Sequence, residues 1–117
     1  MGQRCYVTPM TNFTLNDLEK RVAERASDSA DVSYTRKLLD KGVAQCAKKF
    51  GEEAIETVLA ATGESRERLI SETADVLYHL LVVLKSRDVT LADVEAELAA
   101  RTARSGLDEK AARKSGN

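Results

Sequence analysis

The chain has 117 residues, which is enough for one domain with its own hydrophobic core. Its formal net charge of -1 gives no long-range attraction to nucleic acid or to an anionic membrane, so we expect neither as a partner. Aromatic residues make up 4% of the chain and Trp is absent, which argues against a stacking platform for bases or sugars.

The cysteine content indicates a reduced protein. Cys5 and Cys46 are too few and too far apart for a disulfide framework, and no CxxC motif occurs. With His79 as the only histidine, a Cys/His zinc site is not expected. The first ten residues lack the apolar segment of a signal peptide, and no stretch approaches the length of a membrane span. We therefore expect a cytoplasmic protein.

The pattern along the chain predicts an all-α fold, a bundle of four to five helices within residues 13–104. Residues 1–12 have no clear period and contain the only proline, so we expect a loose arm there. The segment 105–117 is expected to be a mobile tail.

Thr14 and Asp17 have the spacing of a capping box, which predicts the start of the first helix. One apolar face follows, formed by Leu15, Leu18, Val22 and Ala26. The helix should fade at residues 27–29, where Ser and Asp favour a cap or a turn.

A second helix is expected to begin near Ser33, and Gly42 kinks or ends it, because glycine is unfavourable inside a helix. Beyond Gly42 the helical pattern resumes and ends at Gly63. One side of this segment is apolar and is formed by Val43, Ala47, Phe50, Ala54 and Val58.

Two further helices complete the pattern. Ser65 is a candidate N-cap for a long helix that runs to about Arg87. The spacing of Thr90 and Asp93 predicts the start of a last helix, which runs to about Ala103.

Two short acidic clusters are the most informative feature of the sequence. They consist of Glu52, Glu53 and Glu56, and of Glu72 and Asp75. Steps of three and four residues place side chains on one helical face, so each cluster can direct carboxylates to one place. Hard divalent cations such as Mg²⁺ prefer oxygen ligands and commonly bridge to substrate phosphates. The five acids therefore suggest a metal-dependent phosphate site between two helices.

Each cluster also has an explanation without a metal. The first can lie on a solvated face, where Lys48 and Lys49 pair with the glutamates one turn away. The second runs into the apolar segment 76–84, in which unpaired carboxylates are costly. Either a bound cation or a salt-bridge network with a facing helix would satisfy them.

The neighbouring side chains have two explanations as well. Lone basic residues on helices are usually solvated, although Arg36, Lys37, Lys48 and Lys49 can also neutralise phosphate oxygens. His79 follows Asp75 by one turn and can hydrogen-bond a carboxylate or the substrate, or be an ordinary core histidine. We expect Cys46 to contribute packing only.

Several segments resemble a known family. Residues 52–56 and 72–75 form an EExxE and ExxD pair, which looks like the signature of the all-α NTP pyrophosphatase (MazG-like) superfamily. The similarity to the phosphoribosyl-ATP pyrophosphatase family within it lies in segments 33–42 (SYTRKLLDKG), 48–56 (KKFGEEAIE), 72–82 (ETADVLYHLLV) and 89–98 (VTLADVEAEL). The resemblance covers about residues 14–103.

The resemblance implies hydrolysis of phosphoribosyl-ATP to phosphoribosyl-AMP and pyrophosphate, the second step of histidine biosynthesis, with one or two Mg²⁺ ions. It implies the metal ligands Glu53, Glu56, Glu72 and Asp75. Glu52 would be an accessory ligand or would orient the water that attacks the α-phosphorus. The expected substrate contacts are Lys48 and Lys49 at the phosphates, Ser33, Tyr34, Arg36 and Lys37 at the phosphoribosyl end, and His79. The chain lacks the cysteines of a fused zinc cyclohydrolase, so a stand-alone pyrophosphatase is expected.

Two alternatives remain open at this point. A pyrophosphatase of the same fold can act on another nucleotide, for example as a house-cleaning enzyme for dNTPs. A non-catalytic helical dimer with salt-bridged acidic stripes is the second, and it would not respond to Mg²⁺.

The apolar helix around residues 76–84 predicts self-association. Four or five short helices cannot easily cover a helix that is apolar on all sides except at His79. A large exposed apolar patch is uncommon on a soluble monomer, so we expect a homodimer or a higher homo-oligomer. Leu80, Leu81 and Leu84 are expected in the core or the interface, and the family resemblance also implies a homodimer.

Overall fold

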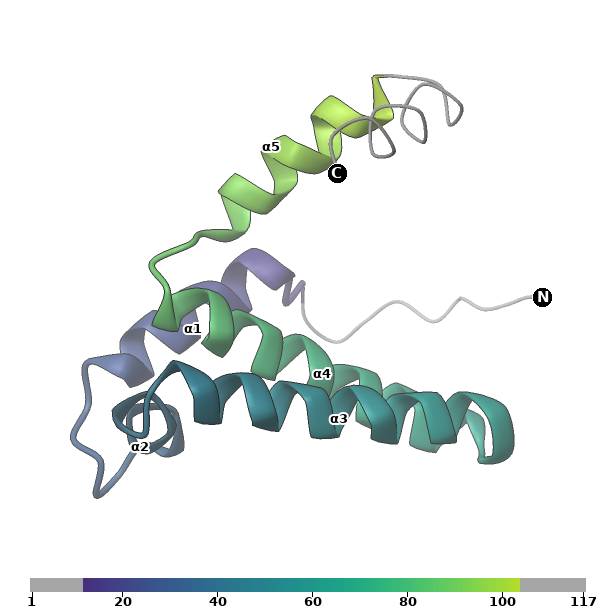
Figure 1. Cartoon of the computed structure of the whole chain (residues 1–117), viewed down its shortest axis with the longest axis horizontal. Helices are drawn as coiled ribbons and strands as arrows, with labels where there is room; N and C mark the ends of the chain where they lie inside the picture. Colours follow the sequence, from purple (N-terminus) through teal and green to yellow (C-terminus); the bar gives the residue numbers. More distant parts are fainter. Residues whose placement is uncertain (1–11, 104–117) are drawn as a thin grey trace.

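A computed structural model describes residues 12–103 and shows five helices and no strand in this range. The predicted all-α fold is therefore confirmed (Figure 1). The helices are α1 (Leu15–Ala26), α2 (Tyr34–Asp40), α3 (Val43–Gly63), α4 (Arg66–Ser86) and α5 (Leu91–Thr102). The predicted arm, apart from Asn12, and the predicted tail lie outside the described residues.

The helices α3 and α4 form a long hairpin that organises the rest of the molecule. Each has 21 residues, and only Glu64 and Ser65 connect them, so they pack side by side along their length (Figure 1). The Ser65 hydroxyl accepts a hydrogen bond from the Arg68 amide at 3.2 Å, which caps α4 as predicted. Residues far apart in the sequence are thus brought together across this hairpin.

The helices α1 and α2 lie against one end of the hairpin (Figure 1). The predicted capping box is present, because the Thr14 and Asp17 side chains each accept a hydrogen bond from the other residue's backbone amide. Gly42 has φ +98°, a left-handed conformation that favours glycine, and it separates α2 from α3. Of the two possibilities given for Gly42, the structure shows the end of a helix rather than a kink.

The core is small and draws on four of the helices. It consists of Val22, Leu38, Cys46, Leu81 and Val82. Cys46 is fully buried, its thiol lies 3.5 Å from the carbonyl oxygen of Leu38, and burial raises its pKa. Packing is therefore the role of Cys46 in the fold, as predicted.

The apolar side of α3 is not the side that α3 buries within the chain. Val58 is 60% exposed, and Ile55 and Leu59 beside it are 63% and 52% exposed. The deeply buried residues of α3 are instead Cys46 and Ala60. The helix is rotated so that the side with Cys46, Glu53 and Ala60 faces inward, which leaves an apolar strip of Ile55, Val58 and Leu59 uncovered in the single chain.

The last helix stands apart from the other four (Figure 1). It begins with the predicted capping box of Thr90 and Asp93, and none of its residues is buried. Its start is held by the Leu91 amide, which donates a hydrogen bond to Glu19 Oε2 of α1 at 2.7 Å. Among the described helices, none combines the length and apolar character that a membrane crossing requires.

Candidate metal and substrate site

Three carboxylates meet across the α3–α4 hairpin. Glu53 of α3 and Glu72 and Asp75 of α4 each offer an oxygen, and these oxygens lie within 4.8 Å of one another. Glu72 is buried, Glu53 is half-buried and Asp75 is exposed, so the group opens to solvent at Asp75. An all-oxygen donor set with several negative charges fits a hard divalent cation such as Mg²⁺.

Basic side chains also neutralise this group. The Lys49 ammonium lies 3.5 Å from Glu52 and 3.9 Å from Glu53, and the Arg68 guanidinium lies 2.5 Å from Glu72. The pKa of Lys49 is raised, first by the Tyr34 hydroxyl and then by Glu52 and Glu53. Arg68 lies on α4 itself, four residues before Glu72, so this ion pair is not the salt bridge with a facing helix that was the alternative to a cation. The Arg68 side chain is 51% exposed, so it can move aside for a cation without loss of packing.

The other two predicted acids lie at the edge of this group. Glu52 and Glu56 are on α3 beside Glu53, and both are exposed. Neither belongs to the three-carboxylate group of Glu53, Glu72 and Asp75. Their assignment as an accessory residue and a metal ligand stays a prediction.

His79 lies deeper, among aromatic rings. It is 7% exposed, its ring centroid is 4.9 Å from that of Tyr78 and 6.3 Å from that of Tyr34, and its Nδ1 has no hydrogen-bond partner. Burial lowers the pKa of His79, although Glu53 opposes this shift. The imidazole stands one turn beyond Asp75, where burial disfavours its charged form.

The residues predicted at the phosphoribosyl end fall into two groups. Ser33 is buried, donates from its hydroxyl to the carbonyl of Arg25 at 2.8 Å, and accepts from the Arg36 amide at 3.0 Å. Arg36 pairs with Asp40 at 2.7 Å and donates to the carbonyl of Ala26 at 2.8 Å. These two side chains tie α1 to α2.

By contrast, Tyr34 and Lys37 remain accessible, as does Lys48, which was predicted at the phosphates. The Tyr34 ring is stacked near Tyr78 with a centroid distance of 6.4 Å and is 53% exposed. It therefore presents one face of an aromatic pair to the surface beside His79.

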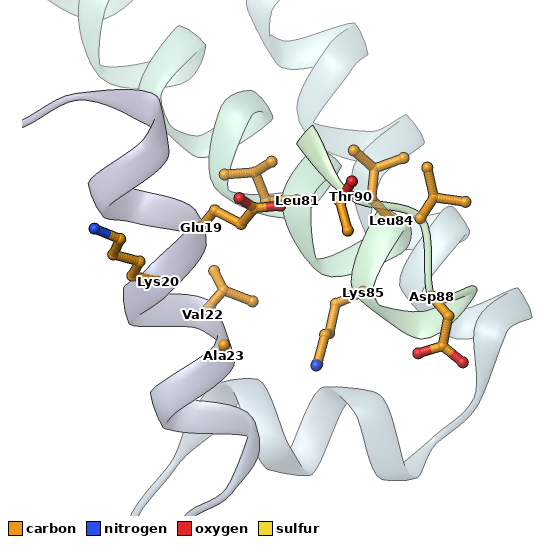
Figure 2. Close-up of a pocket in the computed structure, with 10 residues that line it drawn as sticks. Glu19, Lys20, Val22, Ala23, Leu81, Leu84, Lys85, Asp88 and Thr90 are labelled. Carbon is orange, nitrogen blue, oxygen red and sulfur yellow. The ribbon is translucent and has the colours of Figure 1, made fainter. Parts of the chain in front are cut away.

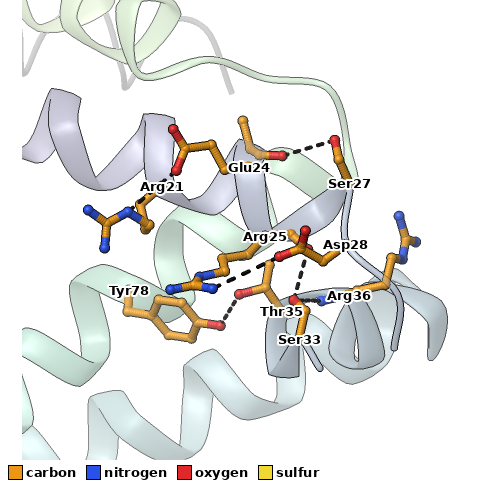
Figure 3. Close-up of polar contacts among 10 residues, drawn as sticks. Arg21, Glu24, Arg25, Ser27, Asp28, Ser33, Thr35, Arg36 and Tyr78 are labelled. Carbon is orange, nitrogen blue, oxygen red and sulfur yellow. Dashed lines mark hydrogen bonds and ion pairs between the residues drawn. The ribbon is translucent and has the colours of Figure 1, made fainter. Parts of the chain in front are cut away.

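Tyr78 was missed by the sequence reasoning. Its hydroxyl lies 2.5 Å from Thr35 Oγ1, which joins α4 to α2, and burial raises its pKa (Figure 3). A signal existed, because Tyr78 follows Asp75 by three residues and therefore lies one turn away on a nearby face of the helix.

A cavity of about 330 Å³ lies on another part of the molecule, between α1 and the end of α4 (Figure 2). Apolar groups such as Val22, Leu81 and Leu84 line it, with Lys85 and Asp88 among the charged residues. None of the predicted site residues lines this cavity, so it is separate from the three-carboxylate group.

Comparisons with known proteins agree with one another. The model of a family described as phosphoribosyl-ATP pyrophosphohydrolase matches residues 15–102, which is the span from the start of α1 to the end of α5. A phosphoribosyl-ATP pyrophosphatase 1 from Rhodopseudomonas palustris is 62% identical over 90% of this chain and 98% of its own length. A phosphoribosyl-ATP pyrophosphatase from Nitrobacter winogradskyi is 59% identical over 97% of both chains.

Proposed function

Because this chain belongs to the phosphoribosyl-ATP pyrophosphohydrolase family, it is a hydrolase, and we propose that its three-carboxylate group forms the metal site of the reaction. The reaction is the hydrolysis of phosphoribosyl-ATP to phosphoribosyl-AMP and pyrophosphate, the second step of histidine biosynthesis. Water adds to the α-phosphorus, the bond from that phosphorus to the oxygen bridging to the β-phosphate breaks, and pyrophosphate leaves.

The observation that carries the metal proposal is the convergence of Glu53, Glu72 and Asp75 from two helices within 4.8 Å. Mg²⁺ held there would supply charge neutralisation for the triphosphate and a water of lowered pKa. Glu56 and Glu52, on the same helix as Glu53, would complete the ligands or orient that water. One or two ions fit this set of acids.

The chain's own basic residues would position the triphosphate. Lys49 already lies 3.9 Å from Glu53, so its ammonium can contact a phosphate oxygen beside the metal site. Lys48 is exposed next to it and would serve the outer phosphates. The protein forms no covalent bond to the substrate, so positioning and charge neutralisation supply the catalysis.

A carboxylate-to-amide series tests the metal site. Glu53→Gln, Glu56→Gln and Asp75→Asn keep the side-chain shape but each removes a negative charge, so Mg²⁺-dependent turnover of phosphoribosyl-ATP should be lost while the helical circular dichroism is kept. Glu95→Gln, an exposed change on α5, is the control and should leave turnover intact. Near-normal activity of Glu53→Gln or Asp75→Asn at saturating Mg²⁺ would refute the assignment. Turnover of a dNTP panel, measured alongside, separates this substrate from the house-cleaning alternative.

The uncovered strip on α3 supports a homodimer as the working form. Ile55, Val58 and Leu59 are each more than half exposed in the single chain, and Ile70 of α4 is 53% exposed. Side chains at these spacings share one helical face, and such a patch is uncommon on a monomer. A second copy, related by a two-fold axis, would cover it.

We also place the enzyme in the cytoplasm. Cys46 is a free, buried thiol rather than part of a disulfide, which is consistent with a reducing compartment.

A further inference from the structure

Two arginines of α1 face a cavity beside the aromatic pair. Arg21 and Arg25 are one turn apart, and both line a cavity of about 420 Å³ together with Tyr34 and Tyr78. Figure 3 shows the Arg25 side chain extending toward Thr35 and Tyr78. Neither arginine is next to the acidic clusters in the sequence, and their spacing alone does not indicate a binding site.

This cavity adjoins the proposed metal site through a short series of contacts. Tyr78 follows Asp75 by three residues, which is about 4.5 Å along the helix axis. The Tyr34 ring lies near both Tyr78 and His79, and its hydroxyl is close enough to Lys49 to raise the pKa of that ammonium group. Lys49 in turn lies 3.9 Å from Glu53. A single extended ligand can therefore reach from the carboxylates past Tyr34 to the arginines.

The two guanidinium groups are available for a ligand. Arg21 is paired with Glu24 at 3.5 Å and lies 6.0 Å from the Phe13 ring centroid, and Arg25 is paired with Asp28 at 3.9 Å. The arginine side chains are 54% and 52% exposed. Ion pairs of this kind contribute little, so both arginines can give them up for a doubly charged anion.

We propose that Arg21 and Arg25 bind the terminal phosphate of the phosphoribosyl group, and that this contact distinguishes phosphoribosyl-ATP from ATP. The proposal rests on the proposed function, in which the triphosphate lies at Glu53, Glu72 and Asp75. A phosphate monoester carries nearly two negative charges at neutral pH, and the planar arginine fork suits its oxygens. Ser33 also lines this cavity, but its hydroxyl is hydrogen-bonded to the carbonyl of Arg25, so Arg21 and Arg25 supply the positive charge there. The contacts expected of Ser33 and Arg36 stay predictions.

Steady-state kinetics on single variants test the assignment. Arg21→Gln and Arg25→Gln should each raise KM for phosphoribosyl-ATP roughly 10- to 100-fold, because each removes a charge-assisted contact made in both ground and transition state. The value of kcat should stay within about threefold, since the metal site is untouched. Arg25→Lys should recover part of the loss, because it keeps the charge but not the fork. Lys20→Gln is the matched control, since Lys20 is on α1 but lines the other cavity.

Binding measurements without Mg²⁺ keep the test independent of catalysis. By calorimetry, wild-type protein should bind phosphoribosyl-AMP at least roughly tenfold more tightly than AMP, and Arg25→Gln should bind the two alike. An unchanged KM in both glutamine variants, or an equal rise in Lys20→Gln, would overturn the inference. Failure of the wild type to hydrolyse phosphoribosyl-ATP at all would instead refute the proposed function, so the two failures are distinguishable.

Discussion

At the scale of single residues, Lys49 is the basic residue that pairs with the acids of α3, because its ammonium lies 3.5 Å from Glu52 and 3.9 Å from Glu53. Lys49→Ala should lower kcat/KM for phosphoribosyl-ATP by roughly tenfold or more, since a charge-assisted phosphate contact is lost. Lys20→Ala, an exposed change on α1, should have little effect. If the two variants were equally active, Lys49 would belong to a solvated face that pairs only with its own helix.

The meeting of three acids could be expected from the sequence because its reason is local, while their role as metal ligands stays a prediction. Glu72 and Asp75 are three residues apart and therefore lie on one face of α4, where they meet the half-buried Glu53 of α3. Arg21 and Arg25 could not be found in this way, because their neighbours Tyr34 and Tyr78 come from other helices. Only the docking of α1 onto α2 and α4 brings these four side chains to one cavity.

At the scale of elements, the two capping boxes have different consequences. Thr14 caps α1, in which Val22 and Ala26 are buried, whereas Thr90 caps α5, in which Leu91 is only partly covered and no residue is buried. Thr14→Ala should therefore lower the free energy of unfolding by about 0.5–2 kcal/mol in denaturant titrations. Thr90→Ala should mainly speed hydrogen exchange of the α5 amides, with a smaller change in global stability. If the two variants lowered the free energy of unfolding equally, α5 would unfold together with the core.

The helix boundaries were predictable because caps and glycines are local signals. Ser33, Ser65 and Thr90 each cap the helix that was expected to follow, and Gly42 ends α2 through its left-handed backbone. The rotation of α3 was not predictable, because both of its faces are plausible partners for α4. The structure shows that the side with Cys46, Glu53 and Ala60 faces inward, whereas Glu52 and Glu56 are exposed.

At the scale of the whole molecule, the exposed strip on α3 predicts the assembly. Ile55→Asp should convert a dimer into a folded monomer of about half the mass in light scattering, because it places a charge in the apolar interface. Val32→Asp, at an isolated exposed valine of the loop before α2, should leave the dimer intact. A wild-type protein that is monomeric at micromolar concentration would contradict the proposal.

Leu81 and Leu84 behave differently from the strip on α3. Leu81 is 5% exposed and belongs to the core of the single chain, so Leu81→Asp should unfold the protein rather than dissociate it. Leu84 packs against the same core and is only half-buried. The sequence placed the surplus apolar surface on residues 76–84, six of which are half-buried in the single chain, and their part in an interface stays a prediction.

The hairpin of α3 and α4 also has a consequence for the order in which the molecule folds. Glu53 and Glu72 come from adjacent helices joined by two residues, so the hairpin can close from its turn toward the carboxylate group. Closing in this order keeps the loop-closure entropy of each step small, and it can precede the docking of α1 and α5. Without a cation, however, like charges oppose closure of the hairpin at Glu53, Glu72 and Asp75. Lys49 and Arg68 offset part of this repulsion, and a divalent ion bound by the three carboxylates would offset more of it, so we expect such an ion in the refolding medium to speed folding.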